Sequence, residues 1–128
     1  MATITATVEF LFHTPPVVQI AWYGFVNSGD VGNLVSYPGV PDKTVHFVGA
    51  SGDTFGVSLT VAMYGGMVNS IGVASILKDP TGANIITSSL QLFAIMDNPR
   101  YMAPQITYGG SGTGIALDVI VIGTAPLA

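Results

Sequence analysis

The chain has 128 residues and no cysteine, so we expect a single domain with its own hydrophobic core and without disulfides or thiolate chemistry. Charged residues make up 8% of the sequence, against about 25% in an average soluble domain, and 49% of the residues are hydrophobic. The net charge of −4 and the three dispersed basic residues argue against a nucleic-acid-binding protein. A surface this poor in charge indicates that partners cover much of it, in an oligomer or a larger assembly.

Apolar residues are spread along the whole chain. Polar residues or glycine interrupt every apolar run well before the roughly 18 residues that cross a bilayer, so no membrane-spanning segment is expected. The N-terminal sequence MATITATVEFLF lacks the basic region of a signal peptide. We therefore expect this sequence to form a strand of the mature fold.

Alternating apolar and polar residues predict strands in the N-terminal half. Residues 3–12 alternate well, with Ile4, Val8 and Phe10 among the residues on one face, which predicts a half-buried strand. Two prolines end it, so residues 1–16 are predicted to form an N-terminal strand or arm that pairs in its own sheet or reaches to a neighbour. Residues 17–26 are again rich in β-forming residues, and residues 32–41 are expected to form a connection.

The middle of the chain continues the β pattern. Residues 43–48 and 54–64 are predicted to be consecutive strands, the second with large apolar residues inward and small residues outward. A short strand is expected within residues 71–76, and residues 78–82 have the proline and glycine of a tight turn. Residues 85–96 fit either a strand or a short helical turn, and the alternation favours a strand.

The clearest predicted hairpin spans residues 98–123. Tyr101–Tyr108 and Ile115–Ile122 flank a glycine-rich segment at residues 109–114, which permits a turn with positive φ. Both faces of the second strand are largely apolar, so a second sheet or another subunit is expected to cover it on each side. In total, about eight short strands predict an all-β fold, a compact antiparallel β-sandwich that is jelly-roll-like or a partly open barrel and spans residues 1–128 as one domain.

Few side chains are suited to catalysis. His13 and His46 lie on different predicted strands without metal-like spacing, and zinc takes three or four ligands. Asp118 lies within an apolar strand, where we expect it to face solvent or to pair with a basic residue inside the protein. The glycine-rich segment lacks the ending of a phosphate-binding loop, and Ser111 is not in a nucleophile elbow. We predict a non-enzymatic protein without a metal or cofactor.

The sole arginine and the aromatic residues are the best candidates for an interface. Arg100 lies between Pro99 and Tyr101 and can form a bidentate pair with a carboxylate, either that of Asp97 or one across an interface, while a weak surface salt bridge is the alternative. The aromatic residues suit core or interface packing better than a platform for stacking carbohydrate. The interface candidates are Arg100, Tyr101, Trp22, Tyr23 and Tyr108.

Three blocks of sequence resemble one protein family. They are WYGFVNSGDVGNLVSYPGVPDKTVHFVG from Trp22, DPTGANI at residues 79–85 and NPRYMAPQITYGGSGT at residues 98–113. They are similar to sequences of the small β-sandwich head-decoration, or cement, proteins of tailed bacteriophages, and the resemblance covers roughly residues 20–123. It implies a virion structural protein that binds the outside of an assembled capsid, commonly as a trimer at threefold positions.

The partners implied by this resemblance are the major capsid protein and further copies of the chain in a homotrimer. The implied location is the capsid exterior of a virion that is assembled in the host cytoplasm. An alternative is a phage tail or fibre module that binds host-surface glycans through its aromatic residues. A small hydrolase is disfavoured because no pair of nucleophile and base can be named.

Overall fold

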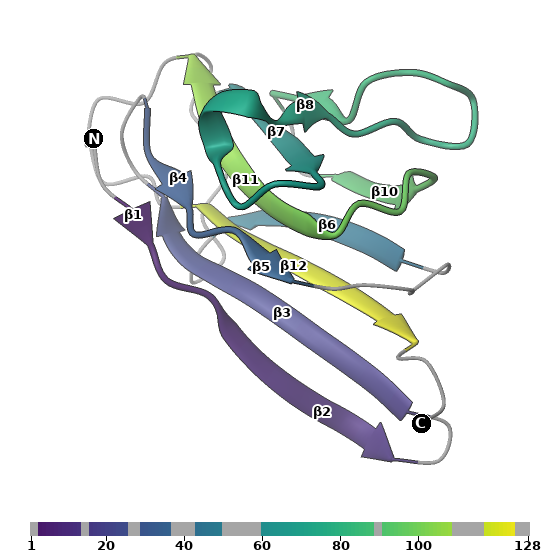
Figure 1. Ribbon diagram of the computed structural model, residues 1–128. Helices are drawn as coiled ribbons and strands as arrows, with labels where there is room; N and C mark the ends of the chain where they lie inside the picture. Colours follow the sequence, from purple (N-terminus) through teal and green to yellow (C-terminus); the bar gives the residue numbers. More distant parts are fainter. Residues whose placement is uncertain are drawn as a thin grey trace.

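The fold is that of a computed structural model in which two β-sheets pack face to face (Figure 1). The sheets are joined by segments that cross from one to the other. The residues that the structure describes are 3–13, 16–25, 29–36, 43–49, 60–88, 91–108 and 117–124. Within these residues, no helix is long and apolar enough to span a membrane.

The first sheet, sheet A, is built around two antiparallel strands, β11 and β7. Strands β4 and β5 pair with β11, strands β8 and β9 pair with β7, and β1 lies parallel to β4 at the edge. The strands are β1 (Thr3–Ile4), β4 (Val31–Gly32), β5 (Val35–Ser36), β7 (Thr60–Gly66), β8 (Ser75–Ile76), β9 (Ile86–Thr87) and β11 (Tyr101–Tyr108). A short 3₁₀ helix, η2 (Ile71–Val73), precedes β8.

The second sheet, sheet B, is entirely antiparallel, in the order β10-β6-β12-β3-β2. Its strands are longer, and β12 lies at the centre. They are β2 (Thr7–His13), β3 (Pro16–Phe25), β6 (Lys43–Gly49), β10 (Gln91–Ile95) and β12 (Leu117–Thr124). In Figure 1, β2 is the outermost strand and runs alongside β3 at the lower left.

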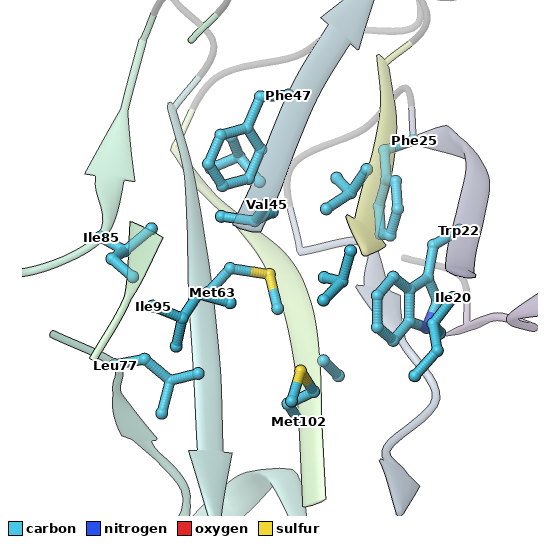
Figure 2. Close-up of a cluster of buried hydrophobic side chains, with 14 of the residues drawn as sticks. Ile20, Trp22, Phe25, Val45, Phe47, Met63, Leu77, Ile85, Ile95 and Met102 are labelled. Carbon is cyan, nitrogen blue, oxygen red and sulfur yellow. The ribbon is translucent and has the colours of Figure 1, made fainter. Parts of the chain in front are cut away.

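Large apolar side chains from both sheets fill the space between them (Figure 2). Alternation along each strand places every second residue in this layer. Sheet A contributes Met63 and Met102, and the rings of Phe47 and Phe93 in sheet B meet edge to face with their centroids 5.8 Å apart. The largest fully buried side chains are those of Trp22, Phe25, Phe47, Ile20, Met63, Ile85, Met102, Ile106, Leu117, Val45 and Val61.

The all-β sandwich expected from the sequence is therefore confirmed. The described residues form two sheets rather than a closed barrel, and they contain twelve strands rather than about eight. Five of the twelve have two residues each, too short for alternation to reveal.

The hairpin predicted at residues 98–123 is wrong. Its first strand, β11, lies in sheet A and pairs with β7, whereas its second strand, β12, lies in sheet B between β6 and β3. The segment therefore passes from one sheet to the other. Each of the two strands is apolar on the face that meets the core, so they stack across the core instead of pairing edge to edge. The glycine-rich residues 109–114 lie outside the described residues.

The N-terminal strand predicted at residues 3–12 is divided between the sheets. Strand β1 belongs to sheet A and β2 to sheet B, and the crossing is held by Asn33, whose Oδ1 accepts a hydrogen bond from the Ala6 backbone N–H at 2.7 Å. The expectation of a half-buried strand does not hold for β2, since Val8 is 51% exposed and Phe10 is 60% exposed. Sheet A does not extend over this edge.

The other predicted elements hold in part. Residues 86–87 and 91–95 are strands, as the alternation favoured, and the turn after Lys78 is present, with the Gly82 N–H donating to the Asp79 carbonyl at 2.9 Å. Residues 32–41 include short strands rather than connection alone. Residues 60–64 lie in β7, but Ala62, predicted to point outward, is fully buried; residues 54–59 lie outside the described part of the chain.

Candidate functional site

Arg100 follows a short segment, residues 97–99, that hydrogen bonds tie to two other parts of the fold. The Asp97 carboxylate accepts a hydrogen bond from the Lys78 backbone N–H at 2.8 Å. The Asn98 side-chain oxygen accepts one from the buried Lys43 ammonium at 3.1 Å. The backbone before Arg100 is thus fixed at two points, and Arg100 itself is exposed.

The Arg100 guanidinium lies beside the ring of its neighbour, Tyr101. Its central carbon is 5.5 Å from the ring centroid, within the range of a cation–π contact. The local pair with Asp97 that the sequence suggested is not found, and the structure records no ion pair between Arg100 and a carboxylate among the described residues. The guanidinium is therefore held over an aromatic ring while its face toward solvent can meet a carboxylate from outside the chain.

A hollow of about 270 Å³ lies next to this segment, between the end of β7, β8 and residues 97–99. Gly65 lets these parts approach closely, because a Cβ atom there would lie 2.7 Å from Leu77 Cδ2 and 2.8 Å from Pro99 Cγ. Met67, which lines the hollow, is 69% exposed, and Met96 beside Asp97 is 63% exposed. We refer to Met67, Met96, Asp97, Arg100 and Tyr101 together as the Arg100 surface.

The remaining three interface candidates lie elsewhere. Trp22 is fully buried in the core, where its Nε1–H donates to the Asn33 carbonyl at 3.1 Å, so it is not part of the surface. Tyr23 is 49% exposed, on β3 of sheet B. Tyr108 ends β11 opposite Thr60, some eight residues of extended chain from Arg100, and its side chain lies outside the described part. Of the five candidates, the structure brings together Arg100 and Tyr101.

Side chains suited to catalysis are not gathered within the described residues. No group of three or more His, Asp or Glu side chains there is placed to hold a metal ion. His46 is exposed on the outer face of sheet B, and the side chain of His13 lies outside the described part. Ser111 also lies outside it.

Asp118 lies partly exposed on the outer face of β12, between the buried Leu117 and Val119, in line with the expectation that it faces solvent rather than a buried basic partner. Its Oδ1 accepts a hydrogen bond from the Gly24 backbone N–H at 3.0 Å. The pairing of β12 with β3 shifts by one residue at this point, and Gly24 has a φ of 90°, so the two residues lie at a β-bulge. The carboxylate therefore has a local structural role, because it accepts a hydrogen bond from an N–H group at the position where the strand pairing is irregular.

A second hollow, of about 360 Å³, lies on the outer face of sheet B, lined by Gln19, Thr44, His46, Leu92, Ile120 and Ile122. Leu92 is 65% exposed and Ile122 is 40% exposed. This face is thus partly apolar as well as open. Sequence patterns do not predict this hollow, because alternation identifies an outer face without showing whether that face is hollowed.

Comparisons with known proteins show a shared fold. No protein-family model matches the sequence, and no curated protein matches it. Among solved structures, the SPBc2 prophage-derived protein YomS is similar over 85% of this chain and 95% of that chain, with a TM-score of 0.58 and 13% identity. The L-ribose isomerase of Cellulomonas parahominis matches with a TM-score of 0.35 and 10% identity over 50% of its own chain, too low a score to support any inference. At 13% identity, the match to YomS shows that the two chains share a fold.

Proposed function

We propose that the chain is a structural protein of a tailed-bacteriophage virion, a non-enzymatic decoration or cement protein that binds the outside of the assembled capsid. The observation that carries the proposal is the likeness to a prophage-derived protein, which extends over most of both chains. The sequence blocks that resemble cement proteins lie within the same β-sandwich. A phage structural role is supported by both, and the capsid exterior is the location that the resemblance favours.

The physical properties of the chain suit such a role. A protein that binds only the assembled lattice stabilises that lattice by mass action, and many symmetric copies multiply the effect. A charge content of 8% lowers the cost of burying the surface against a partner. The homotrimer at threefold positions and the major capsid protein as partner are part of this proposal.

The Arg100 surface is the part of the molecule that we assign to the capsid contact. Arginine and aromatic residues are enriched among the side chains that dominate binding energy at interfaces. Here the hydrogen-bonded segment at residues 97–99 positions Arg100, the ring of Tyr101 supports it, and exposed methionines supply adaptable apolar contact. A capsid carboxylate that pairs with the guanidinium would complete the contact.

Virions of the phage that encodes the chain provide the direct test. Mass spectrometry of purified particles should detect the chain, and cryo-electron microscopy should place a β-sandwich on the outside of the head. If the chain is absent from the head, the proposal is wrong.

Replacement of Arg100 tests the assigned contact. Arg100→Ala should weaken binding to capsids that lack the protein by roughly 30-fold or more, because truncation of a dominant interface arginine costs about 2 kcal/mol or more. Lys78→Ala is the matched control, since it removes another exposed positive charge outside the Arg100 surface. Binding is measured by co-sedimentation, with circular dichroism as the check on folding. Wild-type affinity of Arg100→Ala, or an equal loss in both variants, would count against the assignment.

The alternative of a glycan-binding tail or fibre module has less support. Trp22, the aromatic residue with the largest face for stacking on a sugar, lies in the core and forms a hydrogen bond there. Replacement of Trp22 would therefore be expected to disturb folding rather than glycan binding. A glycan array that gave binding sensitive to Tyr23→Ala would favour the alternative over the capsid role.

A further inference from the structure

The methionines of the described residues form a buried pair and an exposed pair. Met63 on β7 and Met102 on β11 are fully buried and lie in the core in Figure 2. Met67 is 69% exposed and Met96 is 63% exposed, and both belong to the Arg100 surface. In the part of the chain that the structure describes, every methionine side chain that is open to solvent therefore lies at this surface.

The fold places both exposed methionines beside the segment that precedes Arg100. Met67 directly follows β7 and lines the hollow of about 270 Å³ together with residues 97–99. Met96 directly follows β10, and its N–H donates to the Lys78 carbonyl at 2.8 Å, so its backbone is fixed while its side chain is exposed. The two thioethers are thus held where the proposed capsid contact would cover them.

A thioether at the surface reacts with peroxides. Hydrogen peroxide transfers one oxygen atom to the sulfur: the O–O bond breaks, an S–O bond forms, and the other oxygen leaves with both hydrogens as water. The sulfur loses two electrons and the peroxide gains two. The product, methionine sulfoxide, is polar, and this change disrupts interfaces that contain methionine. The chain has no cysteine to compete for the oxidant.

We propose that Met67 and Met96 are oxidation sites that control the Arg100 surface: hydrogen peroxide converts them to sulfoxides in the free chain, and the oxidised chain then binds the capsid weakly. The inference rests on the proposed function, because it takes the capsid as the partner of this surface. Burial of a sulfoxide oxygen without a hydrogen-bond donor is unfavourable, whereas the thioether is buried without that cost. The charge of Arg100 is unchanged, so the loss of binding arises from the two methionines.

Peroxide treatment of the isolated chain tests the sites without any capsid. Peptide mass spectrometry should find one added oxygen on Met67 and on Met96, at a rate at least about tenfold above that of Met63 and Met102, because burial excludes the peroxide from the core. Near-ultraviolet circular dichroism, which reports on the buried Trp22, should stay unchanged and so show that the chain remains folded. Equal oxidation of the four methionines in the folded chain would overturn the assignment of the sites.

Co-sedimentation with capsids that lack the protein tests the effect on binding. The oxidised wild type should bind at least about tenfold more weakly than the untreated wild type. Reduction by the two methionine sulfoxide reductases, one for each sulfoxide epimer, should restore its binding. The double variant Met67→Leu/Met96→Leu has no thioether at either position, so peroxide should leave its affinity, whatever the starting value, unchanged.

The possible results separate the oxidation sites from the function on which their effect depends. Undiminished binding by the oxidised wild type would overturn the inference and leave the proposed function standing. A loss of binding on oxidation of the double variant equal to that of the wild type would do the same. Failure of the untreated wild type to bind capsids would instead refute the proposed function and, with it, the control of capsid binding by oxidation.

Discussion

Gly32 is a position where one added methyl group should disturb the core. It lies on β4, and a Cβ atom there would be 2.6 Å from Trp22 Cδ1, 2.7 Å from Trp22 Nε1 and 2.8 Å from Pro104 Cδ. Unstrained carbon contacts lie at about 3.5–4.0 Å. Both neighbours are rings buried in the sandwich, so neither side chain can turn away. Gly32→Ala therefore requires the indole ring or β4 to move.

The cost follows from these contacts. Overpacking of a core costs about 1–3 kcal/mol, and displacement of the indole also weakens its 3.1 Å hydrogen bond to the Asn33 carbonyl, worth about 1 kcal/mol. The sum, about 2–4 kcal/mol, corresponds to a decrease in Tm of about 8–16 °C for a domain of this size.

Gly66→Ala on β7 is the control for Gly32→Ala. The nearest atom to its added Cβ is the Ala74 Cα at 3.7 Å, an ordinary contact, so it should change the free energy of unfolding by less than about 1 kcal/mol. Thermal and urea denaturation, followed by the fluorescence of Trp22, measure both variants. If Gly32→Ala unfolds within about 2 °C of the wild type, the close packing of Gly32 against Trp22 is refuted.

Two carboxylates provide further predictions. Asp118→Ala removes the acceptor for the Gly24 N–H and should lower the free energy of unfolding by about 1 kcal/mol, whereas Asp118→Asn keeps an acceptor oxygen and should cost less in urea denaturation. The Thr81 hydroxyl, helped by backbone N–H groups, lowers the pKa of Asp79 below its ordinary value of 3.8. The folded pKa is the lower one, so this stabilisation is complete above pH 3.8 and is lost as the pH falls through the lowered pKa. Thr81→Ala should return the pKa of Asp79 toward 3.8 in an NMR titration, and an unchanged pKa would contradict this account.

The fold class could be predicted from the sequence, but the pairing of the strands could not. Alternation shows which face of a strand is buried, because apolar side chains at every second position must meet a core. It does not show which strand lies alongside. Tyr101–Tyr108 and Leu117–Thr124 are close in sequence and both apolar, yet they belong to different sheets. What decides between a hairpin and a crossing is the path of the intervening loop, for which residue patterns are a weak guide.

Sequence patterns are equally unable to show which interface candidates lie at the surface. Trp22 and Arg100 are each the sole residue of their type, so composition alone does not show which of them lies at the surface. The structure separates them, because Trp22 packs beside Gly32 in the core while Arg100 is held at the surface. The exposure of one face of β2 could not be predicted from the sequence for a related reason. Val8 and Phe10 have the alternation of a half-buried strand, and the sequence contains no sign that sheet A stops short of them.

The low charge content of the chain goes together with large apolar side chains that are exposed at the surface. Among the described residues, they include Val8 and Phe10 on β2, Met67 and Met96 at the Arg100 surface, and Leu92 on the outer face of sheet B. A capsid contact confined to the Arg100 surface, as proposed above, would leave the core-facing side of β2 in sheet B uncovered. A chain that met the capsid alone would therefore still expose apolar surface, which soluble proteins rarely tolerate.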